Sequence, residues 1–315
     1  MKPRIYIDGS EGTTGLRIFE RFSGREDIEI LQIDPGLRKD IAERKKLINA
    51  SDITFLCLPD AAAREAVSLI DNDNTRVIDA STAHRTAPGW AYGFPELSPA
   101  MRQAIVTGKR VANPGCHATG FISIVRPLVD AGIIPADALL SCFSLTGYSG
   151  GGKKMIAQYE GEEREAGLDS PRVYGLTQGH KHLPEMQAVC GLAHAPLFSP
   201  IVADYYAGML VSVPLAGSQL TPGTTLSRLH ECLSDAYAGA RLVRVMPLSA
   251  QADVGGFLAA NGCALWDGLE LYVTGNDERM TVLARFDNLG KGASGAAIQS
   301  MNLMLGCDET AGLNV

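Results

Sequence analysis

The first third of the chain alternates short apolar runs with amphipathic stretches, and no other feature of the sequence restricts the fold as strongly. The apolar runs are typical of buried strands, and the stretches between them carry apolar residues at helical spacing. Strands that alternate with helices pair in parallel through right-handed crossovers, so we expect an α/β fold with an open, doubly wound sheet. Such sheets bind ligands at the carboxyl ends of their strands. The expected strands are 4–8, 28–33, 53–58 and 76–79, and the expected helices are 16–22, 39–48 and 61–70.

A glycine-rich turn, residues 9–15, separates the first expected strand from the first expected helix. Its glycines let the backbone approach a pyrophosphate, whose charge then meets the N-terminus of the helix. The GxxGxxG spacing differs from the commoner GxGxxG, and an ordinary turn could produce it. Because the turn lies between a strand and an amphipathic helix, we predict a dinucleotide site. Its candidate contacts are Gly9, Ser10, Gly12, Thr13, Thr14 and Gly15.

The charged residues after the second expected strand bear on the choice of dinucleotide. Asp34 stands where an acidic residue would bind the ribose hydroxyls of NAD. Arg38 and Lys39 follow it and could instead pair with the 2′-phosphate of NADP. The spacing supports both alternatives equally, and a solvated charged turn would look the same.

One cysteine stands where a turn gives way to an expected helix. The turn is Asn113-Pro114-Gly115-Cys116, between a short expected strand at 109–112 and a helical pattern at 117–131. The N–H groups and dipole of a helix N-terminus favour an anion and lower the pKa of a thiol. Cys116 is therefore a candidate nucleophile, and a buried structural cysteine is the alternative on spacing alone.

The later part of the chain predicts a mixed α+β domain. Long alternating strands are expected at 139–146, 206–213 and 279–286, with a helix at 226–237. The first of these strands leads into a glycine run that ends in Lys153 and Lys154, which is either an anion-binding loop or a flexible loop with solvated lysines. No proline- or serine-rich linker separates this part from the first, so we expect an intimate interface between the two domains.

Two histidines separated by one residue, His180 and His182, precede Glu185. If the segment is extended, the two side chains point to opposite faces and only one of them can serve a site. A third metal ligand is lacking nearby, so we expect no metal site. A cysteine nucleophile with a distant histidine as its proton-transfer partner fits the residues better.

Composition excludes several other functions. The chain has 315 residues, enough for about two domains, and a net charge of −7, which argues against nucleic acid or an anionic membrane as a partner. No apolar run approaches the roughly 20 residues that a membrane-spanning helix needs, so a cytoplasmic location is expected. The seven cysteines are scattered, without the spacing of a disulfide framework or a zinc knuckle.

Taken together, the motifs resemble the N-acetyl-gamma-glutamyl-phosphate reductases of the arginine pathway, in the shorter of that family's two types. The larger group includes aspartate-semialdehyde and glyceraldehyde-3-phosphate dehydrogenases. The matching segments are 9–15, 79–85, 113–116, 147–153, 180–185 and 289–304, which occur in the same order and span nearly the whole chain.

The resemblance implies a fold, a cofactor and an assembly. It implies a Rossmann-like dinucleotide-binding domain formed by residues 1–115 with 292–315, and a glyceraldehyde-3-phosphate-dehydrogenase-like catalytic domain at 116–291. A final helix with apolar residues from Ala297 to Leu305 would pack back on the first domain. NADP(H) is the implied cofactor, with Arg38 and Lys39 as candidates for its 2′-phosphate and Ser81 as a further contact. A homodimer or homotetramer is the implied assembly.

The resemblance also implies the reaction. Cys116 would attack the acyl phosphate of N-acetylglutamyl 5-phosphate, phosphate would leave, and hydride reduction of the thioester would give the semialdehyde. The family's catalytic histidine aligns with His180, while His182 stays possible. Further candidates for catalysis or substrate contact are Glu185, Arg85, Ser149 and Lys153. The alternatives are the same reduction of an N-acetyl-aminoadipyl phosphate, one methylene longer, and a nucleotide-binding sensor without catalysis.

Overall fold

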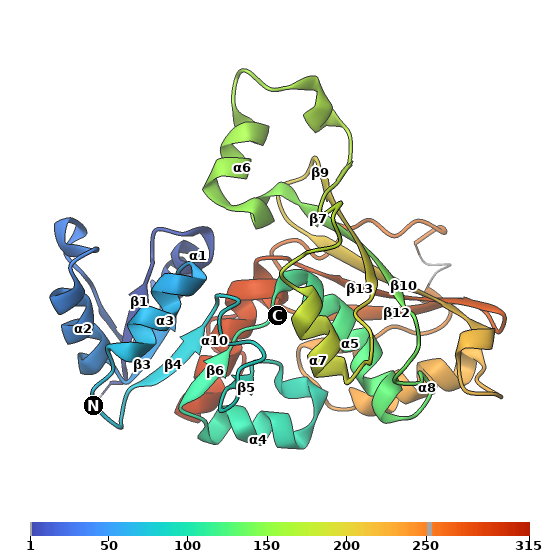
Figure 1. The fold of residues 1–315 in the computed structure, drawn as a ribbon, viewed down its shortest axis with the longest axis horizontal. Coiled ribbons are helices and arrows are strands. Elements are labelled where there is room, and N and C mark those ends of the chain that lie inside the picture. Colours follow the sequence, from blue (N-terminus) through green and yellow to red (C-terminus); the bar gives the residue numbers. More distant parts are fainter. Residues whose placement is uncertain (1, 251–253) are drawn as a thin grey trace. The chain divides into compact units, whose positions relative to one another are not determined.

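The computed structural model describes residues 2–250 and 254–315, which fold into two compact units (Figure 1). The first unit is built from Met1–Pro95, Pro99–Pro114 and Ala293–Leu313. The second is built from Glu96–Ser98, Gly115–Gly292 and Asn314–Val315. Among the described residues, no helix combines the length and the apolar character needed to cross a membrane.

The first unit contains a six-stranded sheet in the order β2-β1-β3-β4-β6-β5, with every neighbouring pair parallel. Its strands are β1 (Arg4–Asp8), β2 (Glu29–Leu31), β3 (Ile53–Leu56), β4 (Arg76–Asp79), β5 (Ala91–Tyr92) and β6 (Arg110–Ala112). Its helices are α1 (Thr13–Phe22), α2 (Ile41–Ala50), α3 (Asp60–Ser68), α4 (Pro99–Thr107) and α10 (Gly295–Leu305), with a 3-10 turn at Pro35–Leu37. The expected doubly wound parallel sheet is confirmed.

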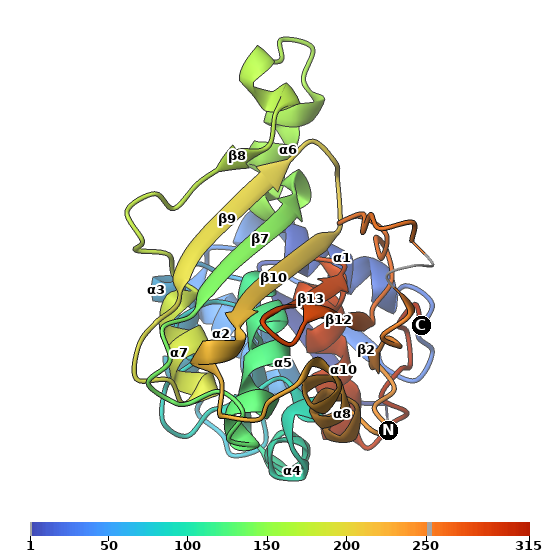
Figure 2. The ribbon, with the colours of Figure 1, turned by 90° about the vertical axis from the view of Figure 1, so that its right-hand side faces the viewer.

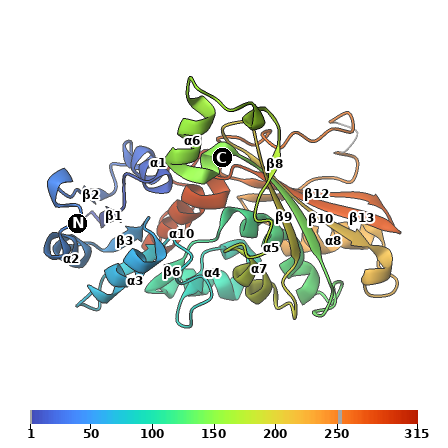
Figure 3. The same ribbon diagram turned by 45° about the horizontal axis from the view of Figure 1, so that its top comes forward.

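Helices cover both faces of this sheet, as Figure 3 shows. Apolar residues of α1, α4 and α10 form one core with the strands, and residues of α2 and α3 form another. Ile298 and Met301 of α10 are fully buried in the first of these cores, although they lie nearly 300 residues from β1 in sequence. The last helix, buried at every residue from 295 to 304, therefore completes the first unit, as the resemblance implies.

The second expected strand is longer than the observed one. Residues 28–33 were expected to pair, but β2 contains only Glu29–Leu31. The strand lies at the sheet edge, where β1 offers only Arg4, Ile5 and Tyr6 as partners. The chain then turns at Pro35–Leu37, where the side chain of Asp34 caps the 3-10 turn. Edge position and turn chemistry, which an apolar run does not reveal, shorten the strand.

The second unit contains a seven-stranded mixed sheet in the order β11-β12-β13-β10-β7-β9-β8. Its strands are β7 (Ser141–Gly147), β8 (Arg172–Val173), β9 (Leu197–Ala203), β10 (Met209–Ala216), β11 (Val243–Val245), β12 (Leu269–Asn276) and β13 (Arg279–Phe286). Its helices are α5 (Cys116–Asp130), α6 (Gly152–Glu160), α7 (Leu183–Cys190) and α8 (Leu226–Ala236). Short 3-10 turns occur at Tyr148–Gly151, Ala166–Asp169 and Gly217–Gln219, and a π-helical turn occupies Gly290–Ser294. The expected mixed α+β domain is confirmed.

Helix α5 packs against β10 and β13 on the helical face of this sheet (Figure 2). A glycine makes the close packing possible, because a Cβ added at Gly120 would lie 2.4 Å from Val211 Cγ2 and 2.9 Å from Phe286 Cε1. Any side chain at this position would push the helix off the sheet. Gly120 thus fixes the axis of the helix that begins at Cys116.

Candidate active site

Cys116 is the first residue of α5, as the sequence predicts for a nucleophile at a helix N-terminus. Gly115 caps the helix in an extended conformation, and its carbonyl accepts from the backbone N–H of Thr119 at 2.8 Å. Cys116 is half-buried, whereas the residues on either side of it are buried. A thiol in this place meets the N–H groups of the first turn and the positive end of the helix dipole, both of which favour the thiolate.

Other thiols of the chain lie in environments that oppose ionisation. Burial raises the pKa of Cys57 to about 12 and that of Cys263 to about 12. Burial also raises the pKa values of Cys142 and Cys190. Cys116, at a helix start, is therefore set apart from these four thiols.

The expectation that His180 and His182 point to opposite faces is wrong. The segment is a turn, not a strand, because the N–H of Leu183 bonds to the carbonyl of His180 at 3.0 Å and α7 begins at once. The two rings therefore lie side by side, 4.7 Å between centroids. Pro184 and the helical turn at Glu185 redirect the backbone, which the two-residue spacing alone does not show.

The two histidines differ in burial and in bonding. His182 is buried, and its backbone N–H donates to Nδ1 of His180 at 3.2 Å. His180 is only half-buried. Because Nδ1 of His180 accepts this bond, the neutral ring carries its proton on Nε2. The proton that His180 can exchange is therefore on a defined atom of the more accessible ring.

A third histidine, His117, joins this cluster and was missed as a site residue from the sequence. Its ring centroid lies 5.6 Å from that of His180 and 5.5 Å from that of His182. Its Nδ1 and Nε2 lie 2.6 Å from the hydroxyls of Ser144 and Tyr174, respectively. Burial, followed by the charges of His180 and Lys181, lowers the pKa of His117 to about 3. His117 is therefore neutral at physiological pH and packs as an uncharged ring beside the accessible histidine.

Glu185 connects the histidine turn to the helix of Cys116. Its carboxylate is buried in the first turn of α7 and accepts from the N–H of Gly115 at 3.2 Å. Helices α5 and α7 pack against each other in the second unit. Glu185 thus anchors the residue before the cysteine and fixes the histidine turn close to it.

Ser149 and Lys153 lie after β7, in different surroundings. Ser149 is fully buried, and its hydroxyl accepts from the side-chain amide of Asn288 at 3.0 Å. The carbonyl of the same amide accepts from the N–H of Gly208 at 2.9 Å. Lys153 is exposed in the first turn of α6. Ser149 is therefore bonded within the protein, and Lys153 reaches solvent.

In the first unit, the glycine-rich turn has the close contacts expected of a dinucleotide loop. Gly9 has φ +88°, and a Cβ there would lie 2.4 Å from the carbonyl oxygen of Cys57. A Cβ at Gly15 would lie 2.4 Å from the carbonyl oxygen of Gly9. Gly12 caps α1, whose first two residues are Thr13 and Thr14. The turn is compatible only with glycine at two positions and presents a helix N-terminus, which fits a bound pyrophosphate.

A cavity of about 240 Å³ adjoins this turn in the first unit. Ser10, Glu11 and Arg38 line it together with apolar residues of α1 and β2. Arg38 pairs with Glu11 at 3.0 Å, and the Asp34 carboxylate accepts from the N–H of Gly36 at 2.7 Å. Asp34 is thus engaged in its own turn, and Lys39 is exposed just beyond it. Of the two candidate contacts for the ribose end of the dinucleotide, Asp34 and Arg38, it is Arg38 that lines the cavity.

Ser81 and Arg85 follow β4 and are bonded to nearby protein groups. Oδ2 of Asp79 accepts from the hydroxyl of Ser81 at 2.8 Å and lies 2.6 Å from Nδ1 of His84, while Oδ1 accepts from the N–H of Ser81 at 2.9 Å. The guanidinium of Arg85 donates to the carbonyl oxygens of Asn113, at 3.0 Å, and Ala80, at 3.2 Å. Arg85 therefore holds the backbone that leads to Cys116.

Comparison with known protein families gives two matches that follow one another along the chain. Residues 9–105 match the family described as Semialdehyde dehydrogenase, NAD binding domain, and residues 116–288 match Semialdehyde dehydrogenase, dimerisation domain. Two solved structures share the fold at low identity. Aspartate semialdehyde dehydrogenase from Francisella tularensis has a TM-score of 0.72 at 12% identity, covering 97% of this chain and 100% of that one. The enzyme from Candida albicans, solved with NADP, has a TM-score of 0.64 at 13% identity, covering 97% and 99%.

The chain therefore has the fold and the two domains of the semialdehyde dehydrogenase group, and it is an oxidoreductase with an NAD binding domain. Closer relatives define the family. The chain is 46% identical to N-acetyl-gamma-glutamyl-phosphate reductase 2 of Nostoc sp. over 99% of both proteins. It is 47% identical to N-acetyl-gamma-glutamyl-phosphate reductase of Rhizobium meliloti over 97% of this chain and 99% of that protein. It belongs to the N-acetyl-gamma-glutamyl-phosphate reductase family, as the resemblance of its motifs predicts.

The depressed pKa of His117 predicts a specific loss of stability in acid. The unfolded histidine takes up a proton near its ordinary pKa of 6.5, whereas the folded one does so only near 3. The stability that this neutral histidine contributes is present above pH 6.5 and is lost progressively down to pH 3. We expect the unfolding free energy of the wild type to fall toward that of His117→Asn by up to about 1.4 kcal/mol per pH unit. Urea unfolding between pH 7 and 4 measures this convergence.

Exposed His194 supplies the control. His194→Asn should stay parallel to the wild type across the same pH range. If the difference in unfolding free energy between His117→Asn and the wild type is constant with pH, His117 is not held neutral by the fold.

Proposed function

We propose that this chain reduces N-acetylglutamyl 5-phosphate to N-acetylglutamate 5-semialdehyde and releases phosphate, with NADPH as reductant, in the third step of arginine synthesis from glutamate. One observation carries the proposal: a half-buried cysteine begins a helix beside a cluster of histidines, in a chain of this family. We assign the first unit to dinucleotide binding and the second to catalysis.

In the proposed mechanism, the thiolate of Cys116 attacks the carbonyl carbon of the acyl phosphate. The carbon–oxygen bond to phosphate breaks, phosphate leaves, and a thioester to Cys116 remains. The helix N-terminus lowers the free energy needed to ionise the thiol. The N–H groups of the first turn are placed to stabilise an oxyanion on the attacked carbonyl.

We assign proton exchange to Nε2 of His180. This nitrogen carries the proton of the neutral ring, and the ring is more exposed than that of His182. A donor at this atom stabilises the oxyanion that forms when the thioester is reduced. Collapse of that intermediate breaks the carbon–sulfur bond, releases the semialdehyde and returns Cys116 as thiolate. His182, His117 and Glu185 hold the two helices and the ring in place.

Bound NADPH supplies the hydride for the reduction of the thioester. The glycine-rich turn and the N-terminus of α1 fit its pyrophosphate, and the 240 Å³ cavity with Arg38 in its wall fits the adenosine end. Lys39, exposed beyond the turn, is a second candidate for the 2′-phosphate. Ser81 stands at the carboxyl end of β4, where ligands of such sheets bind.

Lys153 is our candidate for the anionic groups of the substrate, because it is exposed beside the turn that follows β7. Arg85 and Ser149 support the site through their bonds to Asn113 and Asn288. We assign them to positioning the backbone before Cys116 and the turn before Lys153.

We further propose that the chain works as a cytoplasmic homo-oligomer. The face of the mixed sheet opposite α5 carries exposed apolar side chains, among them Phe143 of β7 and Leu197 of β9. A second copy of the chain would cover such a face, which supports a homodimer or a homotetramer. The match to a dimerisation domain supports the same assignment.

A turnover assay of the reverse reaction tests the function and the nucleophile together. With NADP⁺ and phosphate, the purified chain should oxidise N-acetylglutamate semialdehyde. Cys116→Ser should lower kcat by about a thousandfold or more, because the thioester cannot form, while NADPH affinity is unchanged. Cys307→Ser is the matched control, since Cys307 is a half-exposed thiol of the first unit.

Three outcomes would contradict this proposal. If the enzyme prefers the aldehyde that is one methylene longer, the proposed substrate is wrong. If it oxidises neither aldehyde, the chain binds nucleotide without catalysing this reaction. Activity of Cys116→Ser above about a thousandth of wild type would exclude the covalent route.

The cofactor assignment predicts a selective effect. Arg38→Ala combined with Lys39→Ala should raise KM for NADPH roughly ten- to a hundredfold and leave KM for NADH nearly unchanged, because only NADPH carries the 2′-phosphate. Glu11→Gln should act in the opposite direction, since it removes the carboxylate that pairs with Arg38. Arg64→Ala, exposed on α3, is the control. Equal loss for both cofactors would show that these residues do not bind the phosphate.

The histidine assignment predicts different defects for two neighbouring rings. His180→Asn should lower kcat by about 10²- to 10⁴-fold and slow the alkylation of Cys116 by iodoacetamide near neutral pH. His182→Asn should act mainly on substrate KM or on stability, because that ring is buried. Alkylation rates and steady-state kinetics of both variants show which histidine exchanges the proton. Slower alkylation in His182→Asn alone would assign that role to His182.

A further inference from the structure

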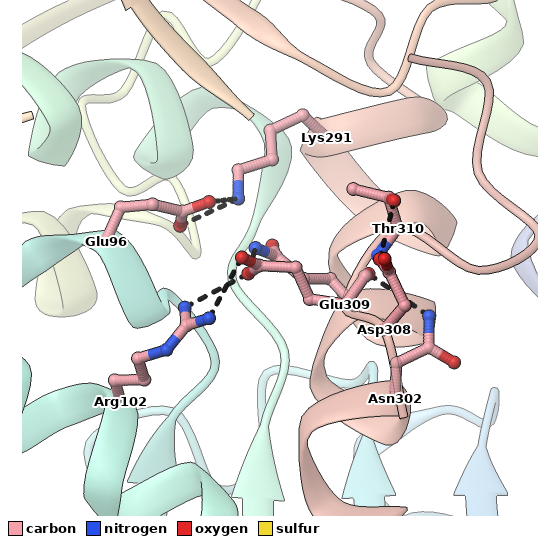
Figure 4. A network of polar contacts seen from close by, with 8 residues as sticks. Glu96, Arg102, Lys291, Asn302, Asp308, Glu309 and Thr310 are labelled. Carbon is pink, nitrogen blue, oxygen red and sulfur yellow. Dashed lines mark hydrogen bonds and ion pairs between the residues drawn. The ribbon is translucent and has the colours of Figure 1, made fainter. Parts of the chain in front are cut away.

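A buried ion pair, Glu96 with Lys291, lies in the second unit (Figure 4). Nζ of Lys291 lies 2.7 Å and 2.8 Å from the two carboxylate oxygens of Glu96. The side chains of Lys291 and Glu96 are only 1% and 3% exposed. Removing two charges from water is costly, and a buried pair is often no more stabilising than apolar side chains of the same volume. Stability alone is therefore a poor reason for this pair.

Lys291 belongs to a π-helical turn, Gly290–Ser294, that approaches the nucleophile at Gly292. The next residue, Gly292, lies so close to Cys116 that a Cβ added to it would be 3.1 Å from the Cβ of Cys116. The same Cβ would be 3.1 Å from the carbonyl oxygen of Asp287 and from Cε2 of Phe286. Turns of this kind are frequent at functional sites. The backbone at Gly292 thus forms one wall of the space in which the cysteine side chain sits.

The start of this turn is fixed by local hydrogen bonds. The carboxylate of Asp287 accepts from the N–H groups of Leu289 and Gly290, at 2.6 Å and 2.9 Å. Its backbone carbonyl accepts from the N–H of Gly292 at 3.0 Å. Lys291, between these two anchored glycines, extends its side chain to Glu96, which lies nearly 200 residues earlier in the chain. The ion pair is therefore a long-range tie of the turn, beside the hydrogen bond from the side-chain amide of Asn113 to the carbonyl of Ala293 at 2.9 Å.

We propose that Glu96 and Lys291 are positioning residues for Cys116: their ion pair holds Gly292 against the cysteine and confines the thiol to the orientation in which it attacks. The proposal deepens the proposed function and rests on it for the identity of the nucleophile. A salt bridge between two fixed carboxylate oxygens and one ammonium restricts the turn in a way that apolar packing does not, because its geometry is directional. Small displacements of a reacting atom are enough to reduce a rate by about 10²-fold.

The test is the double substitution Glu96→Gln with Lys291→Met, which removes both charges at nearly constant volume and leaves no unpaired charge in the interior. The readouts are the rate of Cys116 alkylation by iodoacetamide at pH 7, followed on the Cys116 peptide by mass spectrometry, and the steady-state kinetics. We expect alkylation and kcat to fall by about tenfold or more and KM for NADPH to change less than about twofold. The single substitution Lys291→Arg, which keeps the positive charge and its partner Glu96, should retain most of the alkylation rate and of kcat.

A second, mostly buried ion pair of the same unit provides the control. Arg285 pairs with Glu270 at 2.7 Å, with side chains 13% and 15% exposed, on β13 and β12. Glu270→Gln with Arg285→Met should lower the melting temperature but leave Cys116 alkylation unchanged. Equal slowing in both double variants would overturn the proposal and show a general loss of stability.

A substitution that adds a side chain at Gly292, beside Cys116, gives an independent measurement. Gly292→Ala should slow alkylation of Cys116, whereas Gly167→Ala, where an added Cβ meets nothing within 4 Å, should not. Normal alkylation in Gly292→Ala would overturn the proposal as well. Because alkylation needs no substrate, these outcomes stand even if the chain turns over a different acyl phosphate.

Discussion

The site depends on the contact between α5 and the mixed sheet, which decides where the helix begins and therefore where the thiol stands. Gly120 brings the helix axis against Val211 and Phe286, and the first turn of the helix then emerges at Cys116. Glu185 ties the residue before the cysteine to α7, and the histidine turn precedes that helix. The orientation of the nucleophile is thus set by packing some way from it, and the histidines follow from the same arrangement.

Local patterns in the sequence predicted the parts of the structure that local physics determines. β1, β4 and β13 have the predicted bounds because β1 and β4 are buried apolar runs and β13 alternates buried with more exposed residues. The position of Cys116 at a helix start followed from the asparagine, proline and glycine before it. The glycine turn after β1 was predicted for the same reason, since close backbone contacts at Gly9 and Gly15 leave no room for other residues.

What the sequence did not reveal was decided by contacts between distant segments. The histidines were placed on opposite faces because the following helix, which turns the backbone at His182, has a weak amphipathic pattern. His117 was missed because its role depends on Ser144 and Tyr174, which come from other parts of the chain. The pairing of Glu96 with Lys291 has no signature at all in a single sequence.

The place of α10 has a consequence for how the chain is made. Its apolar side chains fill the core under β1 and β3, yet the ribosome adds them after every strand of both units. The first unit begins synthesis first but has an incomplete core until residues 293–313 emerge. The second unit is nearly all one continuous stretch that ends at Gly292. Its strands and helices are therefore synthesised before residues 293–313 emerge. On the ribosome, the usual order of N-terminal domain before C-terminal domain is therefore reversed, and the dinucleotide-binding sheet is the last to close.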